Sequence, residues 1–319
     1  MNTVQQPASD VAISMLTPKK YYQKTSGMRS FSNSLVSIMT PIIATALLTL
    51  TNMQVIILVD LLTFGIAFVS LLFFVKIPVI QNENVKKESM LQSVKSGLYF
   101  LKNNLGILYL ILFLAAINFT ASVFNAALPA MLLSRKGGGE VTLGIVNTVT
   151  GITMLVGSVI ASALPAPKSR VRMICNSLLL SMSTENFFLA FGRSVPIWCI
   201  GAILGWIAIP VMNSNMDVIF RNYIPIEMQG RVYSARNTLQ FFTIPIGYFL
   251  GGILVDKVFE PFMASQQSGT LLQEVFGAGK GSGAAFLFFI LGIVGVFTCL
   301  IFRKNTHIWK LDRAVNEIN

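Results

Sequence analysis

Apolar runs of similar length recur along this chain from residue 30 almost to its end, and they limit the folds it can adopt. They lie at about residues 31–50, 55–75, 105–133, 142–164, 173–192, 196–220, 237–255 and 283–302. An α-helix needs about 20 mainly apolar residues to cross the hydrocarbon core of a bilayer. Backbone amides in lipid must be paired internally, and these runs lack the strict alternation of barrel strands. The sequence therefore predicts an all-α, polytopic membrane protein with about eight transmembrane helices.

The basic residues are unevenly distributed among the gaps between these runs. If the segment before the first run is cytoplasmic, 19 of the 24 basic residues lie on the cytoplasmic side and five on the other. The five are Arg135, Lys136, Arg193, Lys257 and Lys280. The positive-inside rule then predicts a multi-pass protein of the cell (inner) membrane with both termini in the cytoplasm.

Composition narrows the class of partner. Hydrophobic residues make up 54% of the 319 and charged residues only 12%, unlike an ordinary soluble domain. A net charge of +11 would suit nucleic acid in a soluble protein, but no gap has the density of basic and aromatic residues of a nucleic-acid face. We expect the lipid bilayer as the main partner and no nucleic acid.

The reactive residue types form no site that would indicate an enzyme. Cys175, Cys199 and Cys299 lie in or beside apolar runs, where a thiol acts as a small hydrophobe. His307 has no second ligand at metal-binding spacing, and no Gly-Lys-Ser/Thr loop for ATP is present. We therefore expect no catalytic residues, no metal and no cofactor.

The chain resembles itself at a shift of 207 residues, which superposes 10–48 on 217–255. The pairs of identical residues include Asp10 with Asp217, Val11 with Val218, Pro18 with Pro225, Arg29 with Arg236 and Leu47 with Leu254. In each copy a helix end with an Asp leads through a proline-containing basic turn into a span. This indicates a parallel repeat of the kind that relates two halves of a transporter. Chance similarity between apolar segments is the alternative.

Three groups of residues carry a resemblance to a known family. They are Tyr223-Ile224-Pro225-Ile226-Glu227-Met228-Gln229-Gly230-Arg231-Val232, with its counterpart at Pro7-Ala8-Ser9 and Leu16-Thr17-Pro18-Lys19, and Leu58-Val59-Asp60-Leu61-Leu62-Thr63-Phe64 with Val75-Lys76-Ile77-Pro78. These strings are similar to the major facilitator superfamily, in its macrolide-efflux-like and siderophore-exporter-like branch. The resemblance aligns the chain with the end of the family's fourth span and its fifth to twelfth spans. The equivalent of the family's gating motif in the second half would lie at 165–172, which is basic but lacks the usual Gly and Asp pattern.

The resemblance implies a partial major-facilitator fold in three parts. Residues 1–76 would be a remnant of the N-terminal half with two transmembrane helices, 77–104 a cytoplasmic linker, and 105–319 a complete six-helix C-terminal half. Met90–Leu101, within the linker, has one apolar helical face and is expected along the membrane surface.

The resemblance also implies a function. It suggests a secondary active transporter for small amphiphilic or hydrophobic solutes, with proton-coupled efflux of drugs such as macrolides. The alternative is a truncated, non-transporting membrane remnant or interaction subunit. The sequence does not decide whether two copies assemble into a homo-oligomer.

Ionisable residues within spans are costly and therefore the first candidates for function. Glu185 lies near the middle of its span and is the candidate coupling carboxylate, with a merely hydrogen-bonded or interfacial residue as the alternative. Asp217 and its repeat partner Asp10 lie about a turn before basic cytoplasmic turns. Candidate gating pairs join these aspartates to Arg221, Arg231 and Arg29. Static pairs that anchor the turns are the alternative.

Polar residues in other spans could line a central cavity with aromatic residues such as Phe124 and Trp206. The candidates are Asn118, Asn125, Asn147 and Asn213. The alternative is that they form hydrogen bonds between helices. Gly201 and Gly205 form a small-xxx-small pair that permits close helix contact, and Pro210 allows a kink.

Overall fold

The structure is a computed structural model that describes residues 2–50, 53–74, 90–267 and 269–316. These residues form helices and loops without a strand. Helices occupy all eight predicted spans. The spans are α2 (Tyr22–Leu50), α3 (Met53–Phe74), α5 (Leu105–Ser134), α6 (Glu140–Ala163), α7 (Arg170–Phe191), α8 with α9 (Val195–Trp206 and Ile209–Tyr223), α10 with α11 (Ile226–Phe241 and Thr243–Ile253), and α14 (Ser282–Arg303). The predicted all-α polytopic fold is confirmed.

Five helical segments of the described chain are long and apolar enough, by length and composition, to cross a membrane. They are Leu105–Ser134, Glu140–Ala163, Val195–Tyr223, Ile226–Ala264 and Ser282–Arg303. Helix α3 contributes a shorter apolar stretch, Gln54–Ser70. Helix α7 falls outside this group because its sequence includes Arg170, Glu185 and several serines. Helix α7 therefore carries polar side chains among more apolar neighbouring helices.

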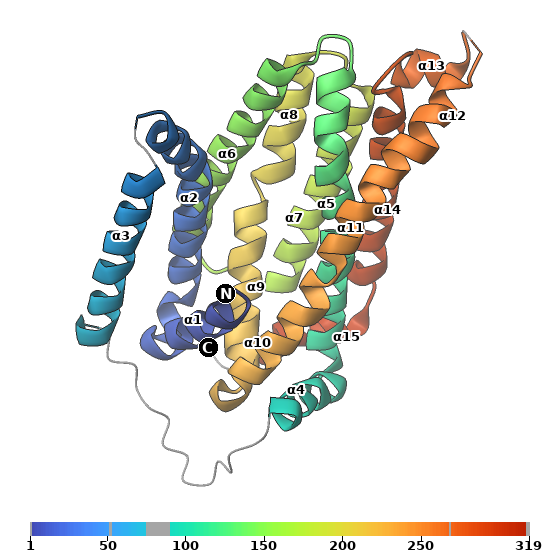
Figure 1. Ribbon diagram of the computed structural model, residues 1–319. Helices are drawn as coiled ribbons and strands as arrows, with labels where there is room; N and C mark the ends of the chain where they lie inside the picture. The colour runs from blue at the N-terminus through green and yellow to red at the C-terminus, as the bar shows by residue number, and fades with distance from the viewer. Residues whose placement is uncertain (1, 51–52, 75–89, 268, 317–319) are drawn as a thin grey trace.

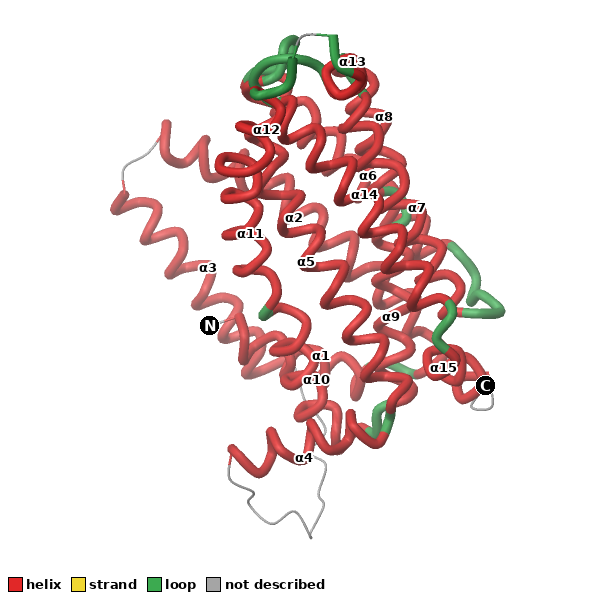
Figure 2. The backbone as a smooth tube through the Cα atoms, turned by 90° about the vertical axis from the view of Figure 1, so that its right-hand side faces the viewer, coloured by secondary structure: helices red, strands yellow, loops and turns green. Residues whose placement is uncertain are grey.

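The long helices stand side by side, and short helices gather at the two ends of the bundle (Figures 1 and 2). At one end lie α1 (Asn2–Leu16), α4 (Met90–Asn103) and α15 (Thr306–Asn316). At the other lie α12 (Glu260–Ala264) and α13 (Leu271–Phe276). The first and last described helices are therefore at the same end.

Two of the predicted spans are not simple helices. The span over 196–220 stops at Trp206 and restarts at Ile209, because Pro210 in the first turn of α9 has no N–H to bond to the preceding turn. The span over 237–255 is the middle of a longer helical run that begins at Ile226 and passes through a π-helical segment at Leu254–Phe259 (η2) into α12.

Buried apolar side chains form two clusters, one toward each end of the bundle. The first includes Phe113, Ile219, Phe220, Tyr233 and Leu311. The second includes Met131, Leu132, Trp198, Phe276 and Phe288. Helix α3 differs, since Leu61, Phe64 and Ile66 are 62%, 67% and 68% exposed. Figure 1 shows α3 beside α2, at the edge of the bundle. Its described side chains suit contact with lipid.

The internal repeat is visible in the helix bounds. Helix α1 (Asn2–Leu16) and helix α9 (Ile209–Tyr223) have 15 residues each and are offset by 207 positions at both ends. Pro18 and Pro225, in the turns that follow, have nearly the same extended backbone, with ψ of 143° and 141°. The contacts are reciprocal, because α1 packs against α10 and α2 packs against α9. Equivalent residues of the two copies are thus brought near each other.

Candidate functional site

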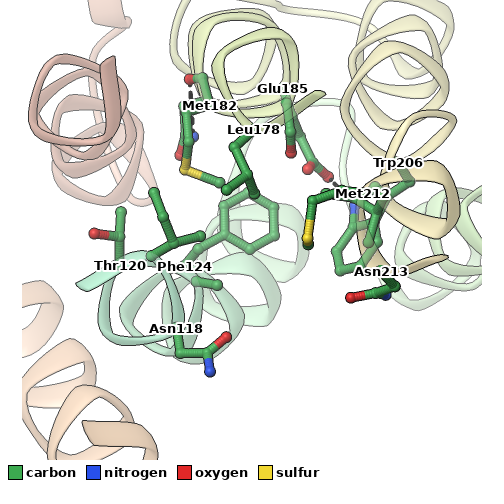
Figure 3. Close-up of a pocket in the computed structure, with 14 residues that line it drawn as sticks. Asn118, Thr120, Phe124, Leu178, Met182, Glu185, Trp206, Met212 and Asn213 are labelled. Carbon is green, nitrogen blue, oxygen red and sulfur yellow. Dashed lines mark hydrogen bonds between the residues drawn. The ribbon is translucent and has the colours of Figure 1, made fainter. Parts of the chain in front are cut away.

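A cavity of about 200 Å³ lies among α5, α7, α8 and α9, and Glu185 lines it. Its apolar lining includes Phe124, Leu178, Met182 and Met212, and its polar lining includes Asn118, Thr120 and Asn213 (Figure 3). The residues of α7 that line it recur every three or four positions and so share one helical face. The cavity is mainly apolar with a few convergent polar groups, which is typical of small-molecule sites.

Glu185 is 6% exposed, and its carboxylate has one identified side-chain partner. Trp206 Nε1 donates a hydrogen bond to Glu185 Oε1 at 2.8 Å, and Figure 3 shows the two side chains turned toward each other. The residues that line this cavity include no arginine or lysine. The carboxylate therefore has oxygen lone pairs available for a proton, a cationic group or a hydroxyl of a solute.

Small residues on α8 explain how α7 and α8 come close enough to form this site. A Cβ atom placed on Gly205 would lie 2.6 Å from Glu185 Cβ, and one on Gly201 would lie 2.6 Å from Phe188 Cβ. Any larger side chain would push the helices apart. The break after Trp206 then separates the indole that contacts Glu185 from α9, which carries Met212 and Asn213.

A second cavity, of about 270 Å³, adjoins the first toward the end that carries α1. Asn118 and Asn213 line both cavities. The charged residues around the second are Asp10, Arg29, Asp217 and Arg236. They are two pairs of repeat-equivalent residues, and they lie on α1, α2, α9 and α10. The packing of the two copies has gathered their charges in one place.

Asp10 connects the two copies. Its carboxylate pairs with Arg29 Nη1 through Oδ1 and with Arg236 Nη2, at 3.4 Å, through Oδ2. Arg236 also donates to Asn237 Oδ1 at 2.9 Å. Asp217 has Arg221, one turn further along α9, at 3.9 Å. One carboxylate thus holds guanidinium groups that are far apart in the chain.

The structure does not bring every predicted site residue to these cavities. Asn125, one turn beyond Ala121 on α5, is exposed and does not line the cavity. Asn147 is exposed next to the buried Val146 on α6. Arg221 pairs with Asp217. Arg231, by contrast, does not line the second cavity, and its Nη1 lies 3.6 Å from Met228 Sδ.

Two residues of the polar network were absent from the predicted candidates. Arg236 was detectable only as the repeat partner of Arg29. Asp312, in α15, accepts hydrogen bonds from the backbone N–H groups of Arg170 and Val171, at 2.9 and 3.1 Å, and so caps α7. No local sequence signal pointed to Asp312.

Arg170, within the basic segment 165–172, has a network of its own. It is 8% exposed, and its Nη1 donates to Asn215 Oδ1 at 2.9 Å and to Gln23 Oε1 at 3.2 Å. It therefore ties α7 to α9 and α2.

Comparisons with known proteins agree with this architecture. Residues 2–247 match the family described as Major Facilitator Superfamily. Macrolide efflux protein A of Streptococcus pyogenes is 23% identical over 256 residues, which cover 79% of this chain and 62% of that protein. A protein of the same name from Enterococcus faecalis is 23% identical over 245 residues, 76% of this chain and 75% of its own length. The uncharacterized MFS-type transporter YfiS of Bacillus subtilis is 21% identical over 262 residues, 79% and 62% respectively. The chain thus spans about three fifths of the length of the streptococcal relative.

Proposed function

The chain belongs to the major facilitator superfamily, and from this premise we propose that it is a secondary active transporter that exports hydrophobic drugs such as macrolides in exchange for protons. The family match and the names of the relatives point to a transporter and not to an enzyme. Two of the relatives are named as macrolide efflux proteins, which supports the proposed substrate class.

The observation that carries the proposal is the buried Glu185 in a mainly apolar cavity. An apolar wall suits a large, weakly polar solute, and a carboxylate at this depth is the usual kind of group for proton exchange in transporters. In the proposed cycle, Glu185 takes up a proton on the outer side as the solute leaves. It releases that proton to the cytoplasm as the next solute binds.

The second cavity, which is lined by Asp10, Arg29, Asp217 and Arg236 and which we call the Asp10 cavity, would act as the cytoplasmic gate. Asp10 joins α1 to both α2 and α10 through Arg29 and Arg236. In alternating access such contacts hold one side closed and break when packed elements move. The proposed gate residues are thus Asp10, Arg29, Asp217, Arg221 and, from its position, Arg236.

The proposed topology places both termini in the cytoplasm, in accord with α1, α4 and α15 lying at one end. Residues 1–76 and 105–319 would belong to the two halves of the fold, joined by 77–104. Of that linker, residues 77–89 lie outside the described part of the chain, and α4 supplies the rest.

The test is accumulation of a fluorescent dye or a radiolabelled macrolide in bacteria that lack their own efflux pumps. Cells that express the chain should accumulate less, and both a protonophore and Glu185→Gln should abolish the difference. Glu140→Gln, an exposed glutamate at the start of α6, is the matched control and should retain export. Accumulation equal to that of empty cells, despite confirmed membrane insertion, would favour the non-transporting alternative.

A further inference from the structure

Helix α13 lies at the end of the bundle opposite α1 (Figure 2). A separate group of charged side chains lies close to it, around Phe276 and Gly277. It lines a cavity of about 560 Å³. Small-molecule sites typically have volumes of roughly 300–1,000 Å³. All of its charged lining residues are cations, and we call it the cationic pocket. They are Arg135, Lys136, Arg193 and Lys280.

Arg135 is the most buried cation of the pocket, with 9% of its surface exposed. Its Nη1 donates to the backbone carbonyl of Leu189 at 3.2 Å, and its Nη2 donates to that of Phe276 at 3.1 Å. These acceptors are neutral. Burial, and secondarily the neighbouring Arg193, lower the pKa of Arg135, which lies just after the last residue of α5. A nearby negative charge would offset both effects, because it stabilises the charged guanidinium.

The acidic residues of this region do not neutralise the pocket. Among the described residues, no carboxylate lies within 4.0 Å of the four cationic groups. Glu260 Oε1 instead accepts hydrogen bonds from the backbone N–H groups of Gly281, at 3.0 Å, and Ala284, at 3.2 Å. Glu274 offers Arg193 its backbone carbonyl. Within the described part of the chain, the acidic side chains therefore form no ion pair with the pocket.

The pocket is also held in shape before any ligand arrives. Both of its arginines are fixed by backbone carbonyls of α13, Arg193 by Glu274 and Arg135 by Phe276. The chain leaves α13 through Gly277, whose φ of 88° is a conformation that other residues rarely adopt. A site whose donors are already positioned loses less entropy when it binds.

We propose that the cationic pocket binds an oxyanion of the phosphate class. Lysine ammonium and arginine guanidinium groups make charge-assisted hydrogen bonds with phosphate oxygens. Arg193, Lys136 and Lys280 are exposed and can reach a ligand at the mouth, while the buried Arg135 supplies fixed charge beneath it. The same chemistry fits an anionic phospholipid headgroup or a free phosphate. This site does not depend on the proposed drug export.

The test uses the full chain in nanodiscs, with two arms that separate the two sources. In one arm, nanodiscs of phosphatidylcholine are titrated with inorganic phosphate by isothermal calorimetry. In the other, native mass spectrometry counts phosphatidylglycerol retained from mixed nanodiscs. Binding in the first arm identifies a free anion, and binding only in the second identifies a lipid headgroup.

The variants tie binding to the pocket. The double variant Arg193→Gln/Lys280→Gln removes two exposed charges and should weaken binding at least tenfold without affecting folding. Lys257→Gln removes an exposed charge of the same kind outside the pocket and should leave affinity unchanged. Absence of binding in both arms, or equal affinity in the wild type and the double variant, would overturn the proposal.

Discussion

At the scale of single residues, the hydrogen bond that Trp206 donates to Glu185 holds the carboxylate in the cavity among α5, α7, α8 and α9. Trp206→Phe removes the donor but keeps an aromatic ring. A hydrogen bond to a charged group contributes about 1.5–3 kcal/mol. We expect Trp206→Phe to destabilise the wild type by that amount and to have a clearly smaller effect in a Glu185→Leu background.

The measurement is a double-mutant cycle by equilibrium unfolding in mixed micelles of dodecyl maltoside and SDS. The cycle separates loss of the hydrogen bond from loss of indole packing, since packing changes in both backgrounds. Equal effects of Trp206→Phe in the two backgrounds would show that the bond contributes nothing.

Asp10 gives a second prediction at this scale. Asp10→Asn leaves Arg29 and Arg236 without their carboxylate partner. Removal of one member of a buried pair costs about 3–5 kcal/mol, and because the Arg29 side chain is 24% exposed we expect about 2–3 kcal/mol here. Asp256→Asn, an exposed aspartate just beyond the predicted span 237–255, should change stability by less than about 0.5 kcal/mol. The same unfolding assay compares them, and similar values for the two variants would contradict this account.

The sequence could identify a site residue when the residue was unusual in its own segment, but not when its role depended on contacts between distant segments. Glu185 could be singled out because a carboxylate in an apolar run is unusual in itself. The roles of Arg236 and Asp312 depend on the packing of α10 against α1 and on α15 reaching the start of α7, which are contacts between distant segments. Asn125 shows the converse, since its spacing of seven residues from Asn118 places it on the same helical face, yet it is exposed and does not line the cavity.

At the scale of helices, the contact between α7 and α8 depends on two glycines. Gly205→Ala would place a methyl group 2.6 Å from Glu185 Cβ and 2.7 Å from its Oε2. Inserting a methyl group into a packed contact typically costs about 1–3 kcal/mol, and displacement of the carboxylate should also reduce export.

Gly144→Ala on α6 is the matched control for this prediction, because nothing lies within 4 Å of the added atom. There the change should be neutral or stabilising by up to about 1 kcal/mol, since alanine favours the helix. Thermal unfolding in detergent and the accumulation assay measure both effects. A Gly205→Ala variant as stable and as active as Gly144→Ala would show that the helices adjust freely.

The helices themselves were readily predicted and their interruptions were not. Length and hydropathy located all eight segments, because a helix that crosses a bilayer must be both long enough and apolar enough. Pro210 indicated a kink, but a proline in a first turn is compatible with either a bend or a fresh start. The structure shows a break at Ile207–Ala208, just before Pro210, and both α8 and α9 pack on α6 and α7.

At the scale of the whole molecule, the charge distribution predicts the orientation. We expect Gln267→Cys, in the loop before α13, to react with a membrane-impermeant maleimide in intact cells. Lys304→Cys, just after α14, should react only after permeabilisation. Both changes are made in a chain with Cys175, Cys199 and Cys299 replaced by alanine, and a permeant maleimide should label both. The reverse pattern would place the termini outside.

The repeat also belongs to this scale, because it determines which charges meet. The matching bounds of α1 and α9 and the reciprocal packing of the two copies bring Asp10 and Arg236 together across 226 positions of sequence. Each copy contains only one residue of that contact, so a search within a single copy could not identify the pair.

The interruption at Ile207–Ala208 would allow α9 to rotate relative to α8 about this joint. Asp217 lies nine residues beyond Ala208, which is about 14 Å at 1.5 Å per residue. A rotation of about 10° at the joint would carry it through roughly 2 Å while α8 and Trp206 stayed in place. A displacement of that size is comparable to the difference between a formed and a broken ion pair. A small angular change beside Glu185 can therefore be converted into making or breaking contacts at the Asp10 end.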